Sequence, residues 1–278
     1  MDGKKPPVDF TGLKNVIWAF AILICLFALL VGLIYAAVNS YDGDREYPTV
    51  QLGSEKKDDG GRKDKNEAGS AAPVSGELNE LPKSKKAGDE YLTSLTFVCD
   101  SANAPLPVLS GRELTVWVGE SGVLNCSSLS TAKIVFPDDG SSVSIANAAM
   151  ISQPKVLVML LGADGIADVT EDAFKTEYAT VIDSVLAASP ETQIICCSIC
   201  PNTVAYAAAD AMAPGVADTV NDWIRTACAR CPVWYADLSS VLTESGYLKM
   251  EYAAENGRSL NADGVEAVLD YLCMHAVG

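Results

Sequence analysis

The sequence predicts an α/β fold in which helices cover both faces of a doubly wound, parallel sheet of about five strands. The first observation is that short apolar runs, rich in β-branched residues, alternate with segments of helical periodicity. Apolar runs without polar alternation are typical of strands that are buried on both faces. The second observation is that these runs end abruptly at acidic, hydroxyl or glycine residues. Strands that alternate with helices in this way favour a three-layer α/β/α arrangement.

The five strands and four main helices follow in order along the C-terminal part of the chain. Strands are expected at Leu95–Val98, Glu113–Val118, Val156–Leu161, Gln193–Cys197 and Val233–Tyr235. Helices are expected at Ser141–Ser152, between the cap Thr170 and Pro190, which follows the helix end, at Val216–Arg230, and from Asn261 onward. Thr170 is a typical N-cap, because two acidic residues follow it in the first helical turn. Pro105 and Pro107 disfavour a regular helix directly after the first strand.

The N-terminal region predicts a single membrane span. Segment 15–38 has no charged side chain and, as a helix, would reach roughly 35 Å, enough to cross a bilayer core. Lys4, Lys5 and Lys14 precede it and acidic residues follow it, so the positive-inside rule places residues 1–14 in the cytoplasm. A cleaved signal peptide is the alternative, but its apolar region would be shorter. We therefore expect a cell-membrane protein whose C-terminal domain is extracytoplasmic.

Between the span and the domain, residues 39–90 are rich in Gly, Ser, Pro, Lys, Asp and Glu. Such a segment cannot bury enough apolar surface to order itself, so we expect a disordered extracytoplasmic tether. The folded domain is then residues 91–278. The chain has a net charge of −16, which argues against nucleic acid as a partner.

Cysteines suggest a metal site only weakly. The pairs Cys197/Cys200 and Cys228/Cys231 have the spacing of a four-thiolate zinc site. However, Cys196 and Cys197 end an apolar run, and buried free cysteines behave as small hydrophobic residues. We expect no cofactor and no metal, while one disulfide is a better alternative than zinc.

The order of four short motifs carries a family resemblance. Phe97–Ser101 places Asp-Ser after the first strand, and Gly119 or Gly122 follows the second. Leu161–Gly165 follows the third strand, and Glu255–Asn261 precedes the last helix. In this order and spacing the folded region resembles the SGNH (GDSL-type) hydrolase family, especially its membrane-anchored bacterial forms. The resemblance implies a flavodoxin-like sheet and acyl-ester chemistry.

The same resemblance implies a degenerate active site. In the family, a serine attacks, a histidine takes its proton, an aspartate orients the histidine, and backbone N–H groups with an asparagine hold the oxyanion. Here Ser101 stands at the nucleophile position, and Gly119 and Asp164 at the oxyanion-block positions. Asn256 and Ser259 stand where the family has aspartate and histidine. Serine lacks useful basicity near neutral pH, and an ionised carboxylate at position 164 only accepts hydrogen bonds.

Two substitutes for the missing base are weaker alternatives. The chain has one histidine, His275, which lies 16 residues beyond Ser259 and, along a helix, roughly 20 Å from the crevice. Asp164, Glu120 and Glu255 could instead supply a carboxylate base, or hold a calcium ion. We interpret Ser101 as the remnant of a former active site.

The leading hypothesis is therefore a membrane-anchored, extracytoplasmic SGNH-like pseudoenzyme. It would bind acylated or glycan material of the cell envelope, or assist a membrane-bound O-acyltransferase. One alternative is an active, divergent serine hydrolase or acyltransferase that uses Ser101. Another is a structural interaction module whose crevice is irrelevant to its role.

Overall fold

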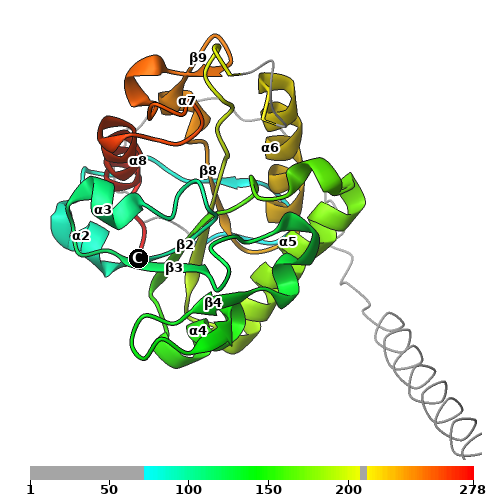
Figure 1. Ribbon diagram of the computed structural model, residues 1–278. Coiled ribbons are helices and arrows are strands. Elements are labelled where there is room, and N and C mark those ends of the chain that lie inside the picture. Colours follow the sequence, from blue (N-terminus) through cyan, green and yellow to red (C-terminus); the bar gives the residue numbers. More distant parts are fainter. Residues whose placement is uncertain (1–71, 207–211) are drawn as a thin grey trace, which may run out of the picture. The chain divides into compact units, whose positions relative to one another are not determined.

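The computed structural model describes residues 72–206 and 212–278 (Figure 1). The expected cytoplasmic segment 1–14, the expected span 15–38 and the part of the expected tether up to residue 71 lie outside the described residues. Within the two described ranges, no helix combines the length and the apolar character needed to cross a bilayer.

The sheet has eight strands rather than about five. In chain order they are β1 (Asn79–Glu80), β2 (Leu95–Cys99), β3 (Thr115–Gly119), β4 (Lys133–Val135), β5 (Ser142–Ser144), β6 (Val156–Leu160), β7 (Gln193–Cys197) and β8 (Trp234–Ala236). Their order across the sheet is β1-β8-β7-β6-β2-β3-β4-β5. Across the sheet, neighbouring strands are parallel for the first six, β1, β8, β7, β6, β2 and β3, whereas the pairs β3–β4 and β4–β5 are antiparallel. The five expected strands are the contiguous middle of this sheet. The three additional ones are short and lie at its two edges, where few residues are buried.

The order of the five middle strands positions the functional crevice. Numbered along the chain, they lie in the order 2-1-3-4-5, which is the flavodoxin-like arrangement. The direction of winding reverses between β2 and β6. In an open α/β sheet, ligands bind beyond the carboxyl ends of the strands at such a switch point. A ligand site is therefore expected at the loops after β2 and β6.

Helices cover both faces of the sheet, as expected for three layers. The first face packs against α4 (Ile145–Ser152), α5 (Glu171–Ala188), α6 (Pro214–Cys228) and the 3₁₀ segment η1 (Cys126–Thr131). The second face packs against α2 (Asp89–Ser94), α3 (Leu106–Ser110), α7 (Ser239–Leu242) and α8 (Ala262–Met274). Figure 1 shows α5 and α6 on one side of the strands and α3 and α8 on the other. The remaining elements are η2 (Ile166–Asp168), η3 (Met250–Tyr252) and the hairpin of β9 (Thr243–Glu244) and β10 (Tyr247–Leu248).

Strand β2 shows why the middle strands were predictable. All five of its residues are buried, and its side chains alternate between the two cores. Val98 packs with Trp117 on the α5 side, whereas Phe97 and Cys99 pack on the α8 side. Truncating a fully buried phenylalanine to alanine typically costs about 3–5 kcal/mol of stability. The side chains of β2 therefore contribute to the cores on both faces of the sheet, which places β2 at the centre of the fold.

Two expected helix starts are confirmed by their caps. The Thr170 hydroxyl accepts a hydrogen bond from the N–H of Ala173 at 3.4 Å, and α5 begins at the next residue. The Asn261 side chain accepts from the N–H of Gly264 at 2.9 Å, and α8 begins at the next residue. Both caps satisfy a backbone donor that the first helical turn leaves free.

Two other expectations differ from the structure. A short helix, α3, follows Ser101 despite Pro105 and Pro107, because these prolines occupy its N-cap and first turn, where no donor is needed. The expected helix from Ser141 starts instead at Ile145, because Ser142–Ser144 pairs as edge strand β5 and Ser144 caps the helix.

The folded region also begins earlier than Tyr91. Strand β1, which lies inside the expected tether, pairs with β8, and the N–H of Leu81 donates to the carbonyl of Tyr235 at 2.8 Å. Leu81 is buried in the core on the α8 side. A few apolar residues and backbone pairing at a sheet edge order this polar stretch, although its composition alone indicates disorder.

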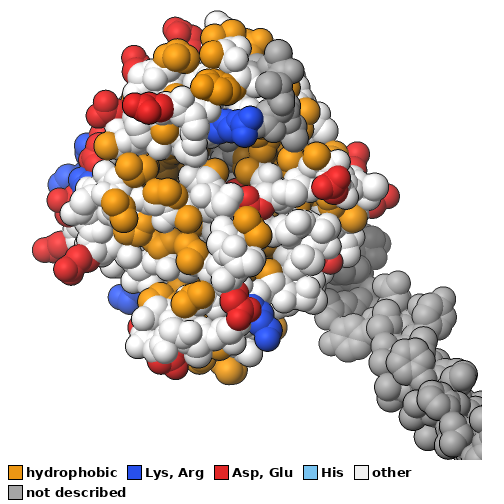
Figure 2. All heavy atoms as spheres, in the orientation of Figure 1, with side chains coloured by type: hydrophobic (Ala, Val, Ile, Leu, Met, Phe, Trp, Pro, Cys, Tyr) orange, Lys and Arg blue, Asp and Glu red, His pale blue; other side chains and the backbone are white. Residues whose placement is uncertain are grey.

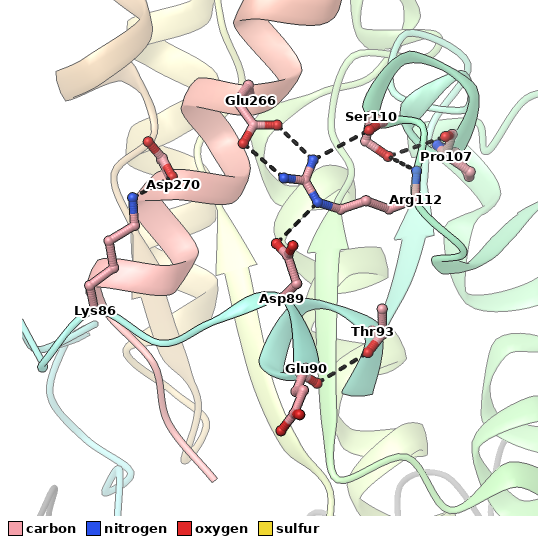
Figure 3. A network of polar contacts seen from close by, with 9 residues as sticks. All are labelled: Lys86, Asp89, Glu90, Thr93, Pro107, Ser110, Arg112, Glu266 and Asp270. Carbon is pink, nitrogen blue, oxygen red and sulfur yellow. Dashed lines mark hydrogen bonds and ion pairs between the residues drawn. The ribbon is translucent and has the colours of Figure 1, made fainter.

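Ion pairs link the residues between β1 and β2 to α8, either directly or through Arg112. The Arg112 guanidinium donates to Glu266 at 2.7 and 3.0 Å and to Asp89 at 3.3 Å (Figure 3). Nearby, the Lys86 ammonium lies 2.9 Å from the Asp270 carboxylate. The two-pronged contact with Glu266 has the fork geometry that suits arginine and a carboxylate. The segment before β2 is thus part of the domain.

The zinc alternative is wrong. Cys197 and Cys200 lie on the α8 side of the sheet, whereas Cys228 and Cys231 lie on the α6 side, so the sheet separates the two pairs. No group of three or more His, Cys, Asp or Glu side chains among the described residues is placed to hold a metal ion. All eight cysteines in the described part of the chain are free thiols, including Cys196. Burial raises the pKa of the Cys196 thiol well above its usual range.

Candidate functional site

A cavity of about 370 Å³ opens at the switch point of the sheet. The loops that follow β2, β6 and β7 line it, together with the loop that precedes α8. Its volume lies within the range of pockets that hold small molecules. Figure 2 shows acidic side chains distributed over the face drawn there, with few basic ones among them. The face drawn there is therefore predominantly acidic.

The loop after β2 delivers two polar residues to this cavity. The N–H of Asp100 donates to the carbonyl of Leu160 at 3.0 Å, which continues the β2–β6 pairing by one step. The chain then turns, and the N–H of Ala104 donates back to the carbonyl of Asp100 at 3.0 Å. Asp100 is thereby buried between the strands, while Ser101 is exposed at the turn. The expected delivery of a serine by a buried strand is what the structure shows.

Ser101 is bound to Asp164 through both its backbone and its side chain. The Ser101 hydroxyl donates to Oδ1 of Asp164 at 2.5 Å, and the Ser101 N–H donates to Oδ2 at 3.0 Å. Asp164 comes from the loop after β6, the neighbour of β2 in the sheet. The adjacent loops at the switch point thus meet through one carboxylate.

A second backbone donor converges on the same carboxylate oxygen. The N–H of Leu124 donates to Oδ2 of Asp164 at 2.8 Å, and the N–H of Cys126 donates to the Asp164 carbonyl at 2.9 Å. Two backbone N–H groups that point at one oxygen form the usual arrangement for stabilising an oxyanion. Here the protein's own Asp164 carboxylate fills that position.

A tight turn after β3 brings Leu124 to this point. The N–H of Gly122 donates to the carbonyl of Gly119 at 2.8 Å, and a Cβ on Gly119 would lie 2.0 Å from the carbonyl oxygen of Val123. Only glycine allows this close approach. Gly119 itself is not among the residues that line the cavity. The glycine expected at the oxyanion block therefore shapes the turn, and the N–H that reaches Asp164 belongs to a residue that sequence reasoning missed.

Asp100 is a second, fully buried carboxyl group in the same cavity. Its Oδ1 accepts from the side chain of Asn103 at 2.9 Å, and its Oδ2 accepts from the N–H of Ala163 at 3.2 Å. Burial and the nearby Asp164 carboxylate raise the pKa of Asp100 to about 6. The hydrogen bonds that it accepts oppose this shift. The motif contributes a buried acid beside the exposed serine.

The loop before α8 places Asn256 and Ser259 in the same cavity. The Asn256 side chain accepts from the N–H of Arg258 and of Ser259, both at 3.0 Å, and donates to the Ser259 hydroxyl at 3.1 Å. These contacts are local to the loop and hold it as a turn, which is an ordinary role of asparagine. Neither side chain is basic.

The four side-chain positions expected at the site therefore converge. Ser101, Asp164, Asn256 and Ser259 all line one cavity. They form two internally hydrogen-bonded pairs, Ser101 with Asp164 and Asn256 with Ser259.

The histidine lies elsewhere. His275 caps α8, is buried, and stacks on Tyr271 with 4.0 Å between ring centroids. It lines a different cavity. It is thus a helix-end residue, as expected.

The site residues present no histidine. Ser259 is a hydroxyl side chain, and the two converging N–H groups are already bonded to Asp164. A calcium ion at Asp164, Glu120 and Glu255 would need three grouped ligands, and no such group exists among residues 72–206 and 212–278. What remains is a cavity of ligand size with hydroxyl, amide and carboxylate groups in its wall.

Comparisons with known proteins add a general likeness. No protein-family model matches the chain, and no curated protein matches it. Among solved structures, it is similar to a GDSL-like lipase from Bacteroides thetaiotaomicron at 12% identity and a TM-score of 0.43, covering 66% of this chain and 88% of that one. It is similar to a carbohydrate esterase family 3 protein from Talaromyces cellulolyticus at 15% identity and 0.39, covering 64% and 92%. The lipopolysaccharide acetyltransferase periplasmic domain of Salmonella ser. Paratyphi A is similar at 12% identity and 0.39, covering 69% and 84%.

Proposed function

We propose that the folded region is an SGNH/GDSL-hydrolase-like domain that binds a ligand at the switch-point cavity without hydrolysing esters. The observation that carries this proposal is the contact between Asp164 and the loops around Ser101. The carboxylate accepts the Ser101 hydroxyl and both converging N–H groups. An acyl substrate would have to displace this carboxylate before its own oxygen could reach the two donors.

The size of the expected loss supports a binding role. Removing one oxyanion donor from a serine hydrolase typically lowers the rate about 100- to 1,000-fold. Absence of a general base costs roughly another 100- to 10,000-fold. With the base position held by Ser259 and the donors bonded to Asp164, both costs apply here.

The ligand and location that we propose follow from the sequence and from the cavity. The uncharged segment 15–38 would anchor the chain in the cell membrane with the domain outside. A domain tethered in this way would meet acylated or glycan material of the cell envelope. It would also be placed to assist a membrane-bound O-acyltransferase, by holding an acceptor or product in the cavity.

Ester hydrolysis by the full-length chain in detergent tests this proposal. With p-nitrophenyl acetate, wild type and Ser101→Ala should release p-nitrophenol at the same background rate. A wild-type rate that exceeds background and disappears in Ser101→Ala would overturn the proposal.

One observation favours a second function, an active hydrolase in which Asp164 is the base. The Ser101 hydroxyl donates a hydrogen bond directly to the Asp164 carboxylate, which is the contact that a general base requires. The Asp164→Asn variant separates the two functions. An Asp164 base would make hydrolysis fall to background in this variant, whereas the binding role predicts no Ser101-dependent hydrolysis in either protein.

A further inference from the structure

The wall of the cavity formed by the loop after β7 contains a buried amide nitrogen that lacks a protein partner in the described part of the chain. Asn202 lines the cavity and is 3% exposed, and its side-chain nitrogen has no hydrogen-bond acceptor among residues 72–206 and 212–278. Among the described residues with such an unpaired buried polar atom, Asn202 is the one that lines this cavity. A buried donor without an acceptor is costly, and the large majority of such groups are paired. Because Asn202 lines the cavity, a molecule bound there is placed to supply the acceptor.

The backbone holds this residue firmly in place. The N–H of Asn202 donates to the carbonyl of Met212 at 3.0 Å, and its carbonyl accepts from the N–H of Leu248 at 3.3 Å. The next residue, Thr203, donates its N–H to the carbonyl of Gly257 at 2.9 Å. The backbone of Asn202 is therefore fixed, and only its side-chain torsions can change. The terminal torsion of asparagine is soft, so the amide can turn toward a ligand in the cavity.

The charges around the cavity restrict the ligand. Its lining includes the carboxyl groups of Asp100 and Asp164 and one guanidinium, Arg258, which has an interaction of its own. Two carboxylates disfavour an anionic ligand. A cationic group, on the other hand, carries no acceptor for the Asn202 nitrogen. The acceptor is thus an uncharged oxygen.

The remaining hydrogen-bonding capacity narrows the choice further. An ionised carboxylate offers about four lone-pair sites, and Asp164 receives three donors, so it can accept one more. Met212 and Leu248 add apolar surface beside Asn202. A group with a carbonyl acceptor, an N–H donor and a small apolar substituent matches all three features. A secondary amide with a short acyl substituent has this composition.

We propose that Asn202 is a ligand-binding residue whose amide nitrogen donates to the carbonyl oxygen of a neutral N-acyl group in the cavity. This inference rests on the proposed function, because both place a ligand in the same cavity. It adds a recognition residue and a ligand class, neither of which follows from the four motifs of the sequence.

The test uses the full-length chain and two small glycosides. Methyl N-acetyl-β-glucosaminide carries an N-acetyl group where methyl β-glucoside has a hydroxyl. Saturation-transfer difference NMR in the same detergent measures the binding of each. We expect transfer to the N-acetyl methyl group of the first glycoside and at least tenfold weaker binding of the second. Equal binding of both, or binding of neither, would overturn the assignment of ligand class.

Asn202→Leu separates a recognition role from a structural one. Because leucine removes the unpaired donor, thermal stability should stay the same or rise, while binding of the N-acetyl glycoside should fall at least tenfold. Asn147→Leu, an exposed change on α4, is the matched control and should leave binding unchanged. Loss of stability with unchanged binding would show a structural asparagine and contradict the assignment. Ester hydrolysis measured separately reports on the proposed function, so the two can fail independently.

Discussion

The two walls of the cavity use their polar groups in opposite ways. On the wall formed by the loops after β2 and β6, the Ser101 hydroxyl and two converging N–H groups are all bonded to Asp164. On the wall formed by the loop after β7, the Asn202 amide nitrogen has no hydrogen-bond partner in the described part of the chain. The family resemblance directs attention to the first wall. The difference teaches that hydrogen-bonding groups on one wall of a cavity can be occupied by the protein itself while a donor on another wall stays open to a ligand, which is the arrangement that our two proposals use.

Replacing three residues around Ser101 should have the largest effect, measured as ester hydrolysis. The variant Asp164→Asn/Asn256→Asp/Ser259→His restores a side-chain donor, an orienting carboxylate and a base around Ser101. We expect Ser101-dependent hydrolysis of p-nitrophenyl acetate at least about 100-fold above wild type, since a positioned base alone contributes that much. The same variant with Ser101→Ala is the control. A folded variant without Ser101-dependent hydrolysis would show that these positions do not converge closely enough for catalysis.

The buried carboxyl group behind the same wall should make stability depend on pH. Because the pKa of Asp100 is raised in the folded state, from 3.8 to about 6, folding favours its protonated form. Stability should therefore be greatest below about pH 4 as far as this group contributes, and decrease as the pH rises to about 6. The shift corresponds to about 3 kcal/mol. Urea unfolding at several pH values should show this decrease in wild type but not in Asp100→Asn. If the free energy of unfolding decreased with pH as steeply in Asp100→Asn as in wild type, Asp100 would not be the group responsible.

A glycine tests how rigidly the other wall is held. Gly257 has φ +62° and packs against the loop that bears Asn202, where an added Cβ would lie 2.1 Å from the Tyr206 ring. Gly257→Ala should cost more than about 2 kcal/mol, because a clash with the ring adds to the backbone strain. Gly122→Ala is the matched control, since Gly122 has φ +81° but open space around its Cβ position, and should cost about 1 kcal/mol. Equal losses on urea unfolding would mean that the two loops are not tightly packed.

The smallest effect is expected at Ser101 itself. Ser101→Ala removes one hydrogen bond at an exposed position, so stability should change by no more than about 1 kcal/mol. Ser121→Ala, at another exposed serine, should behave similarly. A much larger loss at Ser101 on urea unfolding would show that its hydroxyl has a structural role beyond this contact.

The middle of the fold was predictable because its strands are buried on both faces. Runs such as Val156–Leu160 leave no polar alternation, and the Thr170 and Asn261 caps mark helix starts. The edge strands β1 and β5 were missed, because pairing at a sheet edge orders polar residues that carry no apolar signal. Tertiary pairing of this kind cannot be read from local composition.

The site divides along similar lines. Ser101, Asp164, Asn256 and Ser259 follow from the position of their motifs relative to the strands. Leu124 could not be found, since it acts through a backbone N–H that any residue type would supply. Asn202 was missed as well, because a loop asparagine before a helix resembles an ordinary turn residue. Only the burial of its amide beside a cavity distinguishes it.

The reactivity of Ser101 tests the central claim most directly. Full-length protein is treated with a fluorophosphonate between about pH 5 and pH 9, and the adduct is located by peptide mass spectrometry. Because Asp164 holds the Ser101 hydroxyl and both converging N–H groups, no adduct at Ser101 should form at any pH in this range. A fluorophosphonate adduct on Ser101 of the wild-type chain would contradict the account.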